Sequence, residues 1–156
     1  MTNQVKTTGG PPQSPARNAT TFAAMLGRAF AVWLIFIATE SVLGTLRTVF
    51  LEPRIGVALA RQIGFVTGSV ALLFIAWLMI RWIRAESNGA LIMIGVLWAA
   101  LTFAFEMVVG RALGKNWNEL LADYNPLRGG LMWLALLLLL FAPLIAGRLR
   151  SLHRPG

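Results

Sequence analysis

Two glutamates within long apolar stretches are the residues of this sequence with the clearest chemical potential. Glu40 opens the segment ESVLG and Glu106 opens EMVVG, so a glycine follows each acid four positions later, at Gly44 and Gly110. A charged side chain at the centre of a membrane helix costs about 2.5–3.5 kcal/mol on insertion scales. Each carboxyl is therefore expected to be protonated, to face water or to pair with a base. Such a group could carry a proton, bind a cation or fix the register of two helices.

Four arginines are expected near the same side of the membrane as these acids, namely Arg47, Arg61, Arg111 and Arg128. Arg47 follows Glu40 by two helical turns, about 10 Å along the axis, so a base on another helix is the better expected partner. The six side chains could line a polar pocket for a proton, a cation, or the headgroup of an anionic lipid or a quinone. Alternatively they form ion pairs that only hold the helices together. The structural alternative is favoured for Glu106, whereas both remain open for Glu40.

The composition indicates lipid as the main solvent and excludes several kinds of site. Hydrophobic residues make up 57% of the chain and charged residues 13%, against about 25% charged in soluble domains. The absence of cysteine excludes disulfides, thiolate metal sites and iron–sulfur clusters. The single histidine, His153, rules out a haem held by two histidines and makes a histidine-based triad untenable. We expect no catalytic residues, no metal site and no cofactor. No catalytic motif is visible, so a role other than an enzyme is favoured, while Glu, Asp and Arg side chains leave a membrane enzyme acting on lipids as an alternative.

The apolar segments predict an all-α integral membrane protein with four transmembrane helices. We place the spans at residues 22–50, 63–83, 90–110 and 131–147, between a disordered basic tail over residues 1–20 and a basic tail over 148–156. Pro53 is expected to end the first span, with a short connection over residues 54–61. A tight turn over residues 85–89 makes the second and third spans antiparallel neighbours. Ala60, Gly64 and Gly68 recur every four residues, which predicts a close approach by another helix.

The connection before the last span predicts a short amphipathic helix over residues 117–125. Asn116 or Asn118 can cap it, with Glu119 in its first turn. Trp117, Leu120, Leu121 and Tyr124 follow the i, i+3, i+4, i+7 spacing and share one face. We expect this helix to lie at the membrane surface or to cap the bundle, with Trp117 and Tyr124 as interfacial anchors.

The distribution of charge predicts the orientation and the surroundings of the chain. Four spans place both termini on one side, which carries eight of the 14 lysines and arginines. The excess predicts cytoplasmic termini, and the high Ala, Leu, Arg and Gly content suggests a bacterial cytoplasmic membrane. Because the bases cluster at the ends of apolar segments, the net charge of +8 indicates contact with anionic lipids rather than with nucleic acid.

The two halves of the sequence resemble each other at one offset. Glu40 and Glu106 are 66 positions apart, as are Gly44 and Gly110, and Arg61 precedes Arg128 by 67. This spacing predicts a duplicated helical hairpin with a pseudo-two-fold axis along the membrane normal. Coincidence of two similar hydropathy patterns is the alternative.

Three functions fit these features. The small size, the lack of catalytic groups and the small-residue helix faces favour an accessory or assembly subunit of a membrane complex. The intramembrane glutamates and the repeat favour a small transporter or channel subunit, with coupling to protons as one option. A lipid- or quinone-binding protein is the third. Four spans leave little room for a transport pathway within one copy of the chain, so a homo-oligomer or a larger membrane complex is expected.

Overall fold

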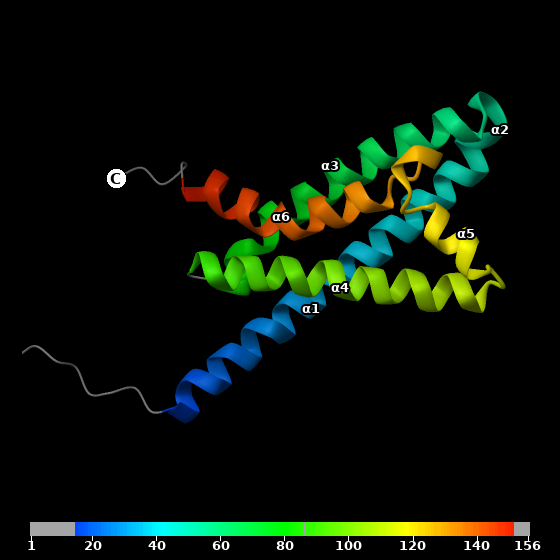
Figure 1. Cartoon of the computed structure of the whole chain (residues 1–156). Helices are drawn as coiled ribbons and strands as arrows, with labels where there is room; N and C mark the ends of the chain where they lie inside the picture. Colours follow the sequence, from blue (N-terminus) through cyan, green and yellow to red (C-terminus); the bar gives the residue numbers. More distant parts are fainter. Residues whose placement is uncertain (1–14, 86, 152–156) are drawn as a thin grey trace, which may run out of the picture.

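The computed structural model describes residues 15–85 and 87–151, and this part of the chain is built from helices without strands (Figure 1). The long helices are α1 (Pro15–Leu46), α3 (Val57–Ile83), α4 (Asn88–Ala112) and α6 (Met132–Ser151). The short ones are η1 (Arg47–Leu51), α2 (Glu52–Ile55), α5 (Trp117–Ala122) and η2 (Pro126–Arg128). Four segments are long and apolar enough to cross a bilayer, at Thr21–Ile55, Val57–Ile83, Asn88–Ala112 and Met132–Arg150. The expected number of spans is confirmed, which indicates an integral membrane protein.

The first hairpin turns more sharply than the sequence predicts. Pro53 does not end the helix, because it lies in the first turn of α2, where its missing N–H is not needed. Before it, η1 is a π-helical segment, and the Glu52 N–H donates to the carbonyl of Arg47 five residues back. Only Gly56, with φ of 80°, separates α2 from α3. The connection is therefore a single glycine rather than residues 54–61, since glycine adopts positive φ without steric cost.

The other boundaries lie close to the predicted ones. The second turn falls between Ile83 and Asn88, and Ser87 caps α4 by accepting a hydrogen bond from the Ala90 N–H at 3.1 Å. At the N-terminus, α1 already begins at Pro15, within the stretch predicted to be a tail. The rest of that tail, residues 1–14, and the end of the basic C-terminal tail, residues 152–156, lie outside the described residues.

The long helices form a ring in which α1 packs on α3, α3 on α6 and α6 on α4. The contact between α1 and α4 is much narrower, because α1 crosses α4 at a steep angle and continues toward α2 (Figure 1). Two indole hydrogen bonds fix this crossing: Trp98 donates to the Ala29 carbonyl at 2.8 Å, and Trp33 donates to the Thr102 hydroxyl at 3.0 Å. Both bonds join residues 69 positions apart, so the two chains run in the same direction through the crossing and have a defined register there.

The hydrophobic core occupies only one half of the bundle. We call this the terminal half, since it lies toward Pro15 and Ser151. Its buried side chains are Met25, Ala29, Val32, Trp33 and Phe36 of α1, Leu72, Ala76, Ile80 and Ile83 of α3, Leu91, Ile94 and Trp98 of α4, and Leu139, Ala142 and Ala146 of α6. The other half, residues 37–71 and 99–138, we call the loop half. The buried residues described there are Ala60, Gly68, Gly110, Leu120 and Gly130.

A candidate polar site in the loop half

The face of α1 that forms the core changes character where it enters the loop half. Ala29 and Phe36 are buried on this face. Glu40 and Arg47 follow Ala29 by 11 and 18 residues, which is close to three and five helical turns. The two charged side chains therefore continue the same face. The helix thus presents apolar side chains to its neighbours in the terminal half and ionisable ones in the loop half.

Glycines on α3 accommodate these charged side chains. A Cβ atom at Gly68 would lie 2.8 Å from both carboxylate oxygens of Glu40, and one at Gly64 would lie 2.8 Å from Cδ of Arg47. Both are closer than real Cβ contacts, so any other residue would displace the charged group. Together with the buried Ala60, these glycines form the predicted small-residue face of α3. The groups this face accommodates are an acid and a base of α1.

Arg47 pairs with Glu52, whereas Glu40 has no close base. Nε of Arg47 lies 3.4 Å from Oε1 of Glu52. The π-helical turn between them allows this contact, because residues five apart share a face when the backbone bonds run from i to i−5. Among the described side chains, no basic nitrogen lies within 4.0 Å of the Glu40 carboxylate, although the residue as a whole is exposed. Arg47 is the base whose charge acts on it. Arg61 and Arg111, expected as partners across helices, make no ion pair with Glu40 in this arrangement.

A second polar group lies where α5 meets the end of α4. Glu106, half-buried on α4, interacts electrostatically with Lys115 and Asp123. Nζ of Lys115 is 3.8 Å from Oδ2 of Asp123. The ring of Tyr124 packs edge-on against Phe103, and its hydroxyl oxygen is buried without a hydrogen-bond partner. Burial raises the pKa of Tyr124 to about 12, with further contributions from the negative charges of Glu106 and Asp123.

Local sequence explains how α5 reaches this position. Asn116 caps the helix as predicted, accepting from the Glu119 N–H at 2.9 Å, and the Glu119 carboxylate accepts from the Asn116 N–H at 2.8 Å. Gly114, with φ of 84°, allows the chain to turn back from α4. The Leu120 side chain then fits against Gly110, where a Cβ atom would overlap it. α5 is consequently held beside the end of α4 (Figure 1).

The face predicted for α5 is divided between two environments. Leu120 is buried and Tyr124 packs on Phe103, so these two residues dock the segment on α4. Trp117 and Leu121 are 58% and 54% exposed. The Arg111 guanidinium lies 5.3 Å from the centroid of the Trp117 ring, and its Nη1 donates to the Lys115 carbonyl at 2.9 Å. Arg111 thus closes the turn that leads into α5.

The six predicted site residues fall into different surroundings. Glu40 and Arg47 form an α1–α3 cluster with Glu52, Gly64 and Gly68, while Glu106 belongs to an α4–α5 cluster with Lys115, Asp123 and Tyr124. Arg111 contacts Trp117, Arg61 is exposed on α3, and for Arg128 only the backbone, in η2, is described.

The indole bonds also relate the positions of the two acids along α1 and α4. In the register of 69 positions, Glu106 lies level with Ile37, about one helical turn from Glu40. The sequence places Glu106 nearer the end of its span than Glu40. In the structure, six residues follow Glu106 to the end of α4 at Ala112, whereas 15 follow Glu40 to the end of the first apolar segment at Ile55.

Sequence reasoning missed several residues that shape the site. Glu52 and Lys115 lie outside the predicted spans and the predicted set of site residues, and Gly95 belongs to no motif identified in the sequence. Gly95 contacts the backbone of Leu140 so closely that a Cβ atom would overlap the carbonyl group. Of the two glycines in the repeated motif, Gly110 meets Leu120, whereas a Cβ at Gly44 would meet nothing within 4 Å. Only the small size of Gly95 in an otherwise bulky span could have indicated a close helix crossing.

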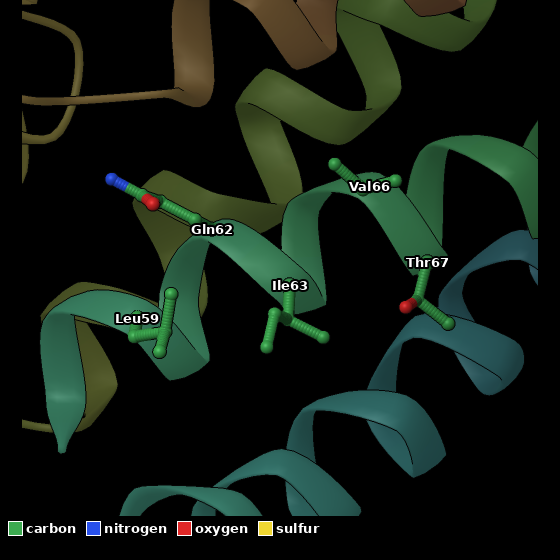
Figure 2. A pocket seen from close by; sticks show the side chains of 5 residues that line it. All are labelled: Leu59, Gln62, Ile63, Val66 and Thr67. Carbon is green, nitrogen blue, oxygen red and sulfur yellow. The ribbon is translucent and has the colours of Figure 1, made fainter. Parts of the chain in front are cut away.

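A shallow hollow on α3 lies apart from both clusters. Its volume is about 270 Å³, and Leu59, Gln62, Ile63, Val66 and Thr67 line it (Figure 2). These side chains all come from α3 and include no ionisable group, so the hollow offers no acid–base chemistry. Among the described residues, no three acids or histidines are grouped closely enough to hold a metal ion.

The chain matches no known family model, and comparisons with curated proteins and with solved structures gave no match.

Proposed function

We propose that the chain is an accessory or assembly subunit of a membrane complex, in which a partner protein covers the α1–α3 cluster. The observation that supports this most directly is the state of Glu40. Glu40 is an exposed residue of a helix long and apolar enough to span the bilayer, and no described base lies within 4.0 Å of its carboxylate. Exposure of an acid to hydrocarbon is costly, so such residues usually face protein, a base or water. A partner helix with a polar or basic residue would remove this cost.

The division of the bundle supports the same proposal. The terminal half buries large apolar side chains from all four long helices, which is what a self-contained fold requires. The loop half has few buried residues in the described part, although the same long apolar helices run through both halves. A subunit that folds through one half and associates through the other would have this distribution.

The register of α1 and α4 favours a second candidate, a small proton-coupled transporter or channel subunit. Glu40 and Glu106 lie about one helical turn apart in this register, and each has a base within electrostatic range. Acidic side chains within transmembrane segments often belong to proton relays. Such a subunit would act as a homo-oligomer, because four spans leave little room for a transport pathway within one copy.

The membrane placement forms part of the proposal. The base excess on the terminal side supports cytoplasmic termini. The exposed Trp117 at the start of α5 supports a position of this short helix at the opposite membrane surface.

Position-specific cross-linking tests the proposed partner, because the chain has no cysteine of its own. Gly44→Cys places one thiol beside Glu40, where a Cβ meets nothing within 4 Å. Leu34→Cys, on the same helix in the terminal half, places one at a residue that is 49% exposed. Each variant is labelled with a thiol-reactive photo-cross-linker in its native membrane, and the adducts are identified by mass spectrometry.

We expect a single stoichiometric partner from Gly44→Cys and none from Leu34→Cys. Loss of that adduct in a Glu40→Gln background would tie the contact to the carboxylate. An adduct with a second copy of the chain would instead favour the transporter. Lipid adducts alone at both positions would exclude a partner at this face.

A further inference from the structure

The last turns of α3 and α6 are joined by an arginine stacked on a tryptophan. The guanidinium of Arg150, near the end of α6, lies 4.5 Å from the centroid of the Trp77 ring on α3. Its Nη2 also lies within 3.4 Å of the Leu78 carbonyl, to which it donates. A guanidinium on an indole face is a favourable cation–π arrangement. The stacking therefore holds the Arg150 guanidinium in one orientation at this end of the bundle.

Most of the donor capacity of Arg150 remains unused. A guanidinium has five N–H donors in a fixed planar fork, and the structure assigns one of them to Leu78. The Nε atom is buried without a hydrogen-bond partner. Arg81 follows Trp77 by four residues and Leu78 by three, so it lies on the same face of α3 one turn further. Arg81 is exposed, so this face of α3 carries a second guanidinium one turn beyond the residues that contact Arg150.

The groups around Arg81 and Arg150 are mostly basic, so an anion from outside the chain is needed to neutralise them. All five acids in the described part of the chain, Glu40, Glu52, Glu106, Glu119 and Asp123, belong to the loop half. The sequence adds only Glu86 near the terminal half, where Arg28 and Arg84 accompany Arg81 and Arg150. Trp77 and Trp82 are 37% and 50% exposed at the same level. Exposed tryptophans next to arginines are typical of the height at which lipid phosphates lie.

We propose that Trp77, Arg81 and Arg150 form a binding site for the phosphate group of an anionic phospholipid. Arg150 supplies a planar fork whose orientation the Trp77 ring fixes, and Arg81 supplies a second fork. Arginine is suited to this role because its N–H groups match two oxygens of one phosphate. The site is independent of the proposed partner at Glu40, since the two lie in opposite halves of the bundle.

Neutralisation of helix ends is the competing explanation of the same bases. A cation in the last turn interacts favourably with the helix dipole. That effect needs charge alone, whereas a phosphate site also needs the planar fork and its stacking platform. Lysine in place of Arg150 therefore separates the two explanations.

Native mass spectrometry of the full chain in mild detergent tests the site, with phosphatidylglycerol and phosphatidylcholine titrated separately. We expect one phosphatidylglycerol molecule to bind more tightly than phosphatidylcholine. Arg150→Gln and Arg81→Gln should each weaken phosphatidylglycerol binding about fivefold, the effect of one base near a lipid surface. Arg54→Gln is the matched control, because Arg54 is an exposed base of α2 in the opposite half. It should leave the affinity unchanged.

Several outcomes would overturn the proposal. These are equal binding of both lipids, an equal loss in Arg54→Gln, or wild-type binding by Arg150→Lys. Displacement of the lipid by inorganic phosphate at comparable concentration would reassign the site to the free anion. Circular dichroism checks that each variant keeps its helices. If Arg150→Gln fails to fold, Arg81→Gln still decides the question, since Arg81 is exposed and its described hydrogen bond is made by the backbone carbonyl, which the substitution keeps.

Discussion

The two halves of the bundle use the same helices and the same kind of small residue for opposite purposes. In the terminal half, Gly95 of α4 lies directly against the backbone of Leu140 of α6, and large apolar side chains fill the surrounding core. In the loop half, Gly68 and Gly64 of α3 lie against the charged ends and stems of Glu40 and Arg47. One glycine therefore brings two backbones together, whereas the others make room for charge.

This difference indicates how stability and function are divided along each helix. A backbone cannot move away from a new side chain without separating two helices, but the end of a long side chain can rotate. The terminal half is therefore expected to tolerate little change, while the loop half should adapt to what it binds. Three predictions test this division, beginning with the largest effect.

The largest effect is expected from Gly95→Ala. The added methyl group would overlap the Leu140 carbonyl, and forcing extra volume into a packed interface costs typically 1–3 kcal/mol and more when backbone must shift. We expect a loss of about 3 kcal/mol in the free energy of unfolding, measured by denaturation in mixed micelles. Gly44→Ala is the matched control, because its Cβ meets nothing within 4 Å and alanine favours a helix by about 1 kcal/mol. Equal stabilities for the two variants would remove the distinction between the halves.

A second prediction concerns Tyr124, which lies where α5 docks on α4 in the loop half. Tyr124 is the only tyrosine in the chain, so the absorbance of phenolate reports this one residue. Burial holds its pKa at about 12 instead of 10.0. The folded protein should therefore titrate near pH 12 and the denatured chain near pH 10. A folded midpoint near 10 would mean that Tyr124 is not packed against Phe103.

The sign of the linked stability change follows from the direction of this shift. Between pH 10 and 12 the folded state retains a proton that the unfolded state has lost. The free energy of unfolding is thus unaffected by Tyr124 below pH 10 and falls as the pH rises toward 12. Tyr124→Phe should abolish this part of the fall. Glu106→Gln should lower the pKa of Tyr124 only partly, because burial is the larger cause and the Glu106 charge the smaller.

The features that sequence alone could predict are local ones. The length of the apolar segments predicted the four long helices, and the spacing of Asn116 and Glu119 predicted the capped start of α5. These depend on neighbours within a few positions along the chain. The single-residue connection at Gly56 was not foreseen, because Pro53 reads as a helix terminator unless a π-helical turn and a new first turn accommodate it.

The contacts of the candidate site required the fold. The spacing of Gly64 and Gly68 predicted a close neighbour but not that Arg47 and Glu40 would be the groups in contact. Nor could spacing show that Glu52 pairs with Arg47, because residues five apart do not share a face in a regular α-helix. The duplication remains a prediction, and the unlike surroundings of Gly44 and Gly110 give it no support.

The smallest effect is expected from Gly68→Ala, the counterpart of Gly95→Ala in the loop half. The new methyl group would meet the Glu40 carboxylate oxygens at 2.8 Å. These oxygens can rotate away, and alanine gains helix propensity, so the net change in unfolding free energy should stay within about 1 kcal/mol. In a Glu40→Ala background the conflict is absent, and the same substitution should stabilise the protein by about 0.5–1 kcal/mol. Denaturation of the four proteins in this double-mutant cycle measures the coupling directly. Identical effects in both backgrounds would show that Gly68 does not accommodate Glu40. Only the contact between Gly95 and Leu140 would then support the proposed difference between the two halves.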